Sequence, residues 1–75
     1  MTNPPELEVA AAIGRMSKGT PRALETFGIE HAFSEYAKSP RFNTQEAREI
    51  LRRLAIEGNE PDLARRLAYK HKILK

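Results

Sequence analysis

The apolar residues of this chain recur at intervals of three and four positions, which is the spacing of amphipathic α-helices. No stretch alternates apolar and polar residues as a half-buried strand does, and glycines and prolines interrupt the pattern at short intervals. The pattern therefore predicts an all-α fold, a small single-domain bundle of four or five short helices that ends in a helical hairpin. The expected helices cover approximately residues 4–18, 21–27, 29–38, 44–57 and 61–74.

The C-terminal hairpin has the clearest pattern, because two amphipathic runs flank a break at residues 58–61. Asn43 is expected to cap the first of these helices, with Glu46 three positions later in a capping-box arrangement. Gly58 is expected to end this helix at the C′ position, since glycine adopts positive φ at little cost. Asn59 then caps the second helix. The predicted inward faces are Ala47, Ile50, Leu51, Leu54 and Ala55 in the first helix and Leu63, Ala64, Leu67, Ala68 and Leu74 in the second.

The N-terminal half adds further helices to the same core. The first helix is expected to end at Gly19, and the apolar face then changes direction within residues 21–38. Leu24 and Phe27 share a face that lies roughly 120° from the face of the apolar residues that follow, at about 100° per residue. This offset predicts a short helix that ends at Phe27, a bend at Gly28 and a new helix beyond it. The other inward residues are Val9, Ala12, Ile13, Met16, Ile29, Ala32, Phe33 and Tyr36.

Ala10 and Gly14 form a small-residue face on the first helix, apart from its apolar stripe. Small side chains let another helix approach closely. Two interpretations of this face stay open: ordinary packing against another helix of the same chain, or the contact of a homodimer.

Charge is distributed unevenly along the chain. Residues 1–40 hold four Lys or Arg against five Glu, a net charge of −1, whereas residues 41–75 hold nine against five acidic residues, a net of +4. Residues 63–75 carry five positive charges and no acidic side chain. A basic C-terminal end indicates an acidic partner: nucleic acid, an anionic membrane or the acidic surface of another protein.

Patterns for catalysis and metal binding are missing from the sequence. It has no cysteine, no HExxH motif, no paired aspartates and no glycine-rich phosphate loop. Its two histidines, His31 and His71, are forty residues apart, and each is expected at the edge of the core or as a capping residue. The sequence therefore predicts a non-enzymatic protein with no catalytic residues, no metal site and no cofactor.

A binding surface is expected on the last helix, where Tyr69 and Ile73 are i,i+4 neighbours on the side away from Leu63 and Leu67. Tyrosine and arginine are favoured anchors of protein interfaces, so this helix predicts a small regulatory or adaptor protein that acts by occlusion or recruitment. Its partner is then another protein with an acidic or mixed surface. The alternatives are phosphate binding to nucleic acid by the same helix, and burial of the Tyr69 and Ile73 pair by another part of the chain. The predicted partner-binding residues are Arg65, Arg66, Tyr69, Lys70, Lys72 and Ile73.

Two other functional classes receive less support from the sequence. No apolar run reaches the roughly 18 residues that a membrane span needs. Binding to a membrane surface would need the apolar face of the last helix, whose Leu63, Leu67 and Leu74 are assigned to the core, so no membrane partner is expected. Because the sequence has no cysteine, the location is expected to be cytoplasmic. Residues 20–38 match the DNA-binding helix-turn-helix pattern in part, with a Gly-Ile pair after a short helix. Glu30 and Glu35 would lie on the base-reading helix and repel phosphates, so we interpret these residues as a bent structural segment.

Overall fold

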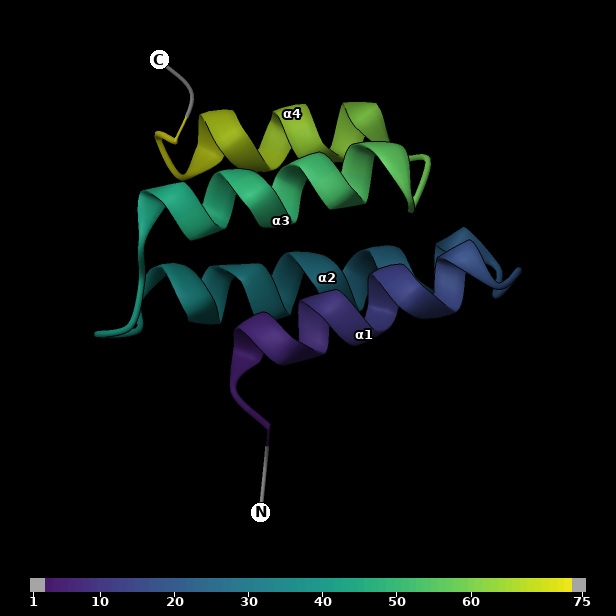
Figure 1. Ribbon diagram of the computed structural model, residues 1–75, viewed down its shortest axis with the longest axis horizontal. Helices are drawn as coiled ribbons and strands as arrows, with labels where there is room; N and C mark the ends of the chain where they lie inside the picture. The colour runs from purple at the N-terminus through teal and green to yellow at the C-terminus, as the bar shows by residue number, and fades with distance from the viewer. Residues whose placement is uncertain (1–2, 74–75) are drawn as a thin grey trace.

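The computed structural model describes residues 3–73, which contain four helices (Figure 1). They are α1 (Pro5–Ser17), α2 (Arg22–Ala37), α3 (Thr44–Ile56) and α4 (Pro61–Lys70). The predicted all-α bundle is therefore confirmed, and the expected helical hairpin is the pair α3 and α4.

The helices pair into two hairpins that pack on each other. Within the hairpins α1 lies against α2 and α3 against α4, and between the hairpins α1 contacts α3 and α2 contacts α4. Both hairpin turns lie at one end of the bundle, and the connection from α2 to α3 lies at the other (Figure 1). The core fills the space between the two hairpins, so each helix has one buried stripe and one face turned outward.

The core contains most of the apolar residues that the helical period places inward. The largest fully buried side chains are Tyr36, Phe33, Ile13, Ile29, Leu54, Leu67 and Val9. Leu24 and Phe27, which the pattern places on a shared apolar face, are 73% and 79% exposed. Leu74, the last predicted core residue, lies outside the described residues.

The predicted bend at Gly28 is wrong, because α2 runs without interruption from Arg22 to Ala37. The angular offset that suggested two helices separates two faces of one helix. The face with Phe33 packs into the core, and the face with Leu24 and Phe27 is exposed. Gly28 has a helical backbone with open space where a Cβ would lie. The turn that a helix-turn-helix motif requires is therefore absent from this segment.

The end of α3 differs from the prediction in which residue adopts positive φ. Asn59 has φ of 55°, whereas Gly58 is buried and outside the left-handed region. A Cβ at position 58 would lie 2.8 Å from the Leu54 carbonyl oxygen and 3.0 Å from Met16 Cε. Glycine is needed here because the backbone approaches the core closely. Asn59 does not cap α4 either, since the N-cap residue is Glu60 and its side chain makes no capping hydrogen bond.

Gly19 ends α1 as predicted, with φ of 106°. Its N–H donates to the Met16 carbonyl at 3.1 Å, and the Thr20 N–H donates to the Arg15 carbonyl at 3.0 Å. These two bonds are the Schellman arrangement, in which the residue of positive φ reverses the chain and satisfies two terminal carbonyls of the helix.

A buried hydroxyl fixes the connection from α2 to α3. Asn43 caps α3 as predicted, because its Oδ1 accepts the Glu46 N–H at 3.0 Å. In a capping box Glu46 would also accept the Asn43 N–H directly, but here the Tyr36 hydroxyl lies between these two groups. This hydroxyl accepts the Asn43 N–H at 3.2 Å and donates to Glu46 Oε1 at 2.6 Å. Burial, together with the bond to the Glu46 carboxylate, raises the pKa of Tyr36 to about 12.

Among residues 3–73, three ion pairs join the two halves of the chain. Arg66 Nη2 lies 2.7 Å from Glu30 Oε2, between α4 and α2. The other two are Arg22–Glu60 at 3.1 Å and Arg41–Glu6 at 3.0 Å. Two of these pairs join an acidic side chain of the N-terminal half to a basic side chain of the C-terminal half, and Arg22–Glu60 has the opposite polarity.

None of the helices between residues 3 and 73 is both long and apolar enough to cross a bilayer.

Candidate functional site

The chain reverses direction directly after α4, and this reversal determines where Ile73 lies. Lys72 has φ of 59° and donates its N–H to the Tyr69 carbonyl at 3.2 Å, while the Ile73 N–H donates to the Ala68 carbonyl at 2.8 Å. This is a second Schellman motif, with lysine at the position of positive φ. The predicted helix over 61–74 is therefore too long, since α4 ends at Lys70.

The prediction that Ile73 faces outward beside Tyr69 is wrong. Ile73 is 3% exposed, whereas Tyr69 is 67% exposed. In a continued helix the two side chains would lie one above the other. Because the Schellman turn folds the chain back, Ile73 instead packs next to Ala68, the apolar contact that usually accompanies this motif.

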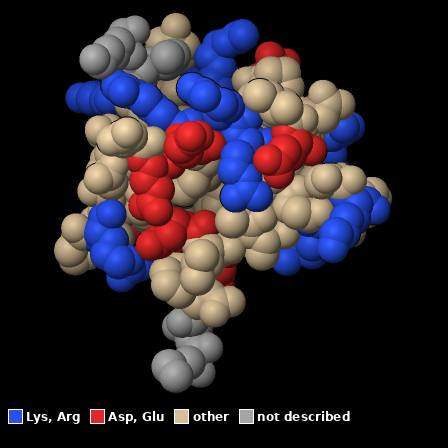
Figure 2. All heavy atoms as spheres, in the orientation of Figure 1, with Lys and Arg blue, Asp and Glu red and all other residues tan. Residues whose placement is uncertain are grey.

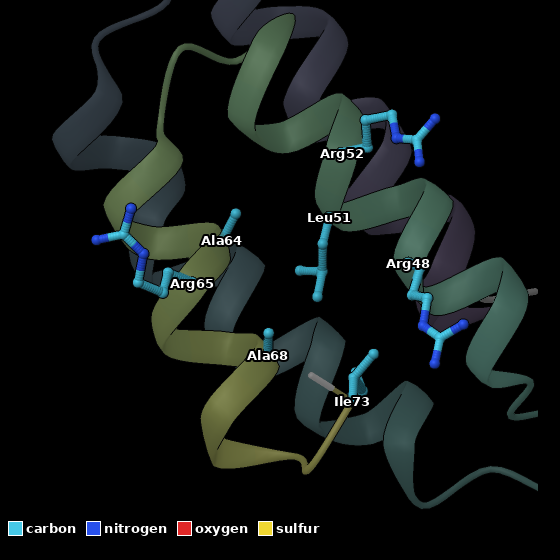
Figure 3. A pocket seen from close by; sticks show the side chains of 7 residues that line it. All are labelled: Arg48, Leu51, Arg52, Ala64, Arg65, Ala68 and Ile73. Carbon is cyan, nitrogen blue, oxygen red and sulfur yellow. The ribbon is translucent and has the colours of Figure 1, made fainter. Parts of the chain in front are cut away.

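A groove of about 480 Å³ runs between α3 and α4, and Ile73 closes one end of it (Figure 3). Its floor is apolar: the side chains of Leu51, Ala64, Ala68 and Ile73 point into the space between the two helices. Each of these four side chains is only 3–7% exposed, so the groove presents narrow strips of apolar surface rather than open side chains.

Three arginines line the edges of this groove. Arg48 and Arg52 extend from α3, and Arg65 extends from α4 on the opposite side, so the guanidinium groups flank the floor without covering it (Figure 3). Neither Arg48 nor Arg52 forms an ion pair with any residue between 3 and 73, and Arg65 reaches only the exposed Asp62, at 3.9 Å. Their charges are therefore available to an acidic ligand.

The structure divides the six predicted partner-binding residues instead of gathering them. Arg65 and Ile73 line the groove. Arg66 pairs with Glu30 on the side of α4 that faces α2. Tyr69 is exposed, as are Lys70 and Lys72, but none of these three lines the groove.

Sequence reasoning placed all the predicted partner-binding residues on the last helix and considered Arg48 and Arg52 of α3 only as an extension of a phosphate-binding surface. Arg48 and Arg52 lie one helical turn apart and flank Leu51, and Ala64 and Ala68 form a matching pair of small residues on α4. The i,i+4 spacing of these two pairs is visible in the sequence. Their pairing across the hairpin requires knowledge of which sides of the two helices face each other.

Charges on the face shown in Figure 2 are mixed. Acidic side chains lie among basic ones across the middle of this face, and basic side chains gather along its upper edge (Figure 2). One i,i+4 ion pair, Arg53–Glu57 at 3.4 Å, lies on the part of α3 outside the groove. This face is not a continuous basic surface.

His71 lies directly before the Schellman turn and packs against Phe33, with 5.3 Å between the ring centroids. Its Nε2 is buried and has no hydrogen-bond partner among the described residues. Burial lowers the pKa of His71 below its ordinary value of 6.5, and the positive charges of Lys70 and Lys38 lower it further. The neutral ring is therefore the form that the fold accommodates.

This environment makes stability depend on pH. Because the folded state binds the His71 proton less readily than the unfolded chain does, the free energy of unfolding should fall as the pH drops through 6.5. Urea unfolding between about pH 8 and pH 5.5 would measure the slope, and His71→Gln should flatten it. His31→Gln, at an exposed position, is the matched control. An unchanged slope in His71→Gln would contradict this assignment.

Comparison with models of known protein families, with curated proteins and with solved structures gives no significant match. A function for this chain is therefore inferred from the groove and the side chains that line it. Among residues 3–73 no three His, Asp or Glu side chains cluster as ligands of a metal ion would.

Proposed function

We propose that this chain is a small, non-enzymatic regulatory or adaptor protein of the cytoplasm that binds another protein through the outer surface of α3 and α4. Binding would act by occlusion or recruitment. The observation that supports the proposal is the apolar groove between the two helices, with arginines on both of its edges. Arginine combined with a well-packed apolar floor is the composition of an interface centre.

Nucleic acid is the alternative partner, because the same half of the chain carries a net charge of +4. Phosphate binding needs cations but has no use for an apolar floor. Tyr69, on α4, is an exposed aromatic ring beside the basic residue Lys70. A single ring offers little stacking surface for a nucleic-acid strand. These features favour a protein partner.

Site-specific photo-cross-linking in the source cell tests whether the partner is a protein or a nucleic acid. A benzoylphenylalanine in place of Arg65, on the groove edge, should still form covalent adducts with a discrete protein, because Arg48 and Arg52 remain on the other edge. The same group at position 27, on the exposed face of α2, should not capture that protein. Mass spectrometry identifies the adducts, and nuclease treatment separates protein from nucleic-acid adducts.

Two arginines of α3 provide the matched variants for this experiment. Arg52→Gln with Arg48→Gln should remove the adduct at position 65, whereas Arg53→Gln, outside the groove, should preserve it. Adducts that nuclease destroys would favour the nucleic-acid alternative. An adduct that persists in the double variant, or that forms equally from position 27, would refute the proposed site.

A further inference from the structure

We infer that the occupant of the groove is an acidic amphipathic α-helix of the partner protein. The inference rests on the proposed function and adds the chemistry and geometry of the ligand. Three properties of the groove support it: an apolar floor between two helices, cations on both edges, and the spacing of the cations along α3.

The floor suits the apolar face of a third helix. Ala64 and Ala68 lie one turn apart on α4, and their small side chains let a helix approach the α4 backbone closely. Leu51 and Ile73 form the rest of the floor, on the α3 side and at the closed end (Figure 3). Helices that enter such grooves insert apolar residues spaced i, i+3 or i+4, and i+7. The limited exposure of the floor residues means that the ligand contributes most of the newly buried apolar area.

The edges determine the charge of the ligand. Arg48 and Arg52 are separated by one turn of α3, about 6 Å between Cβ atoms, which is also the Cβ separation of two acidic residues spaced i,i+4 on a facing helix. Arg65 on the opposite edge would pair with a carboxylate on the other flank of the same ligand helix. Arginine suits this role because its planar group binds a carboxylate through two parallel hydrogen bonds. The ligand is therefore acidic on both flanks of its apolar face.

Other anionic ligands match fewer of these properties. A fatty acid has one carboxylate, whereas the cations lie on both sides of the floor. The bases of a nucleic-acid strand stack on aromatic side chains, and none of the described residues that line the groove is aromatic. An amphipathic acidic helix uses the floor and both edges at once.

Titration of the isotope-labelled full chain with a synthetic helical peptide tests the inference. The peptide has about 14 residues, with leucines at i, i+3, i+4 and i+7 and glutamates along both flanks. Amide resonances of Leu51, Ala64, Ala68 and Ile73 should shift. Replacing the glutamates by glutamine, or the leucines by serine, should weaken binding at least tenfold.

Protein variants complete the design. Arg48→Gln with Arg52→Gln should weaken binding about tenfold, because each of the two exposed ion pairs contributes about threefold to the affinity. Arg53→Gln should change the affinity less than twofold. The weakening in the double variant should diminish at high salt.

Dodecanoate and a single-stranded DNA oligonucleotide are the comparison ligands. Tighter binding of either one at the same four amides would overturn the inference, as would an acidic peptide that binds no better than its glutamine version. If the peptide fails while cross-linking at position 65 still captures a protein, the inference falls and the proposed function stands. If both fail, the groove is not a protein-binding site.

Discussion

Replacing Leu67 by alanine is expected to lower the free energy of unfolding by about 2–5 kcal/mol. Leu67 is 1% exposed and lies among the largest buried side chains of the core, so its truncation removes apolar contacts and leaves a cavity between the hairpins. A domain of 75 residues is expected to have a total stability of roughly 4–11 kcal/mol, so this loss is a large part of the whole. Urea unfolding followed by circular dichroism measures the loss.

Leu24→Ala is the matched control, because it makes the same chemical change on the exposed face of α2. Its effect should stay within about 0.5 kcal/mol, as for other exposed positions. Leu54→Ala, at a fully buried position of α3, should behave like Leu67→Ala. Equal stabilities for the Leu24 and Leu67 variants would show that the core faces are assigned wrongly.

Gly58→Ala is expected to lower the free energy of unfolding by about 1–3 kcal/mol, although alanine usually stabilises helical segments. The added methyl group would lie 2.8 Å from the Leu54 carbonyl oxygen, which belongs to the backbone of α3 and cannot rotate away. Relief therefore requires the turn between α3 and α4 to move. The same unfolding experiment measures the effect.

A second glycine provides a control, because its replacement should change the free energy of unfolding in the opposite direction. Gly28→Ala should raise the free energy of unfolding by about 0.5–1 kcal/mol, since alanine costs less backbone entropy in a helix and no atom lies within 4 Å of the new methyl group. Gly14→Ala should behave in the same way. A loss of stability in Gly28→Ala would indicate that α2 bends at this residue, as the sequence pattern alone suggests.

Helical periodicity was sufficient to predict the fold class, the hairpin and nearly all of the core. Periodicity failed where two different structures produce the same spacing of apolar residues. A 120° change of apolar direction arises from a bent helix and equally from an amphipathic helix with two exposed apolar residues, and Leu24 and Phe27 are the second case. Nothing local distinguishes the two, because the decision depends on which side α1 covers.

The candidate site was harder to predict because it depends on two details of backbone geometry. Lys72 adopts positive φ without being glycine, so the sequence contains no signal for the reversal that buries Ile73. Gly58 appeared to be a helix-ending glycine, yet its role is to let α3 and its turn approach Met16. The arginines of α3 then join the site through the packing of the hairpin and not through their position in the sequence.

The most direct test of the proposed groove is the yield of the protein adduct at position 65 in an Ala68→Leu variant. Leucine at this position fills the floor without removing any charge, and urea unfolding confirms that the variant is folded. We predict that the yield falls at least tenfold relative to the parent chain. An undiminished yield in the folded variant would contradict the assignment of the groove between α3 and α4 as the binding site.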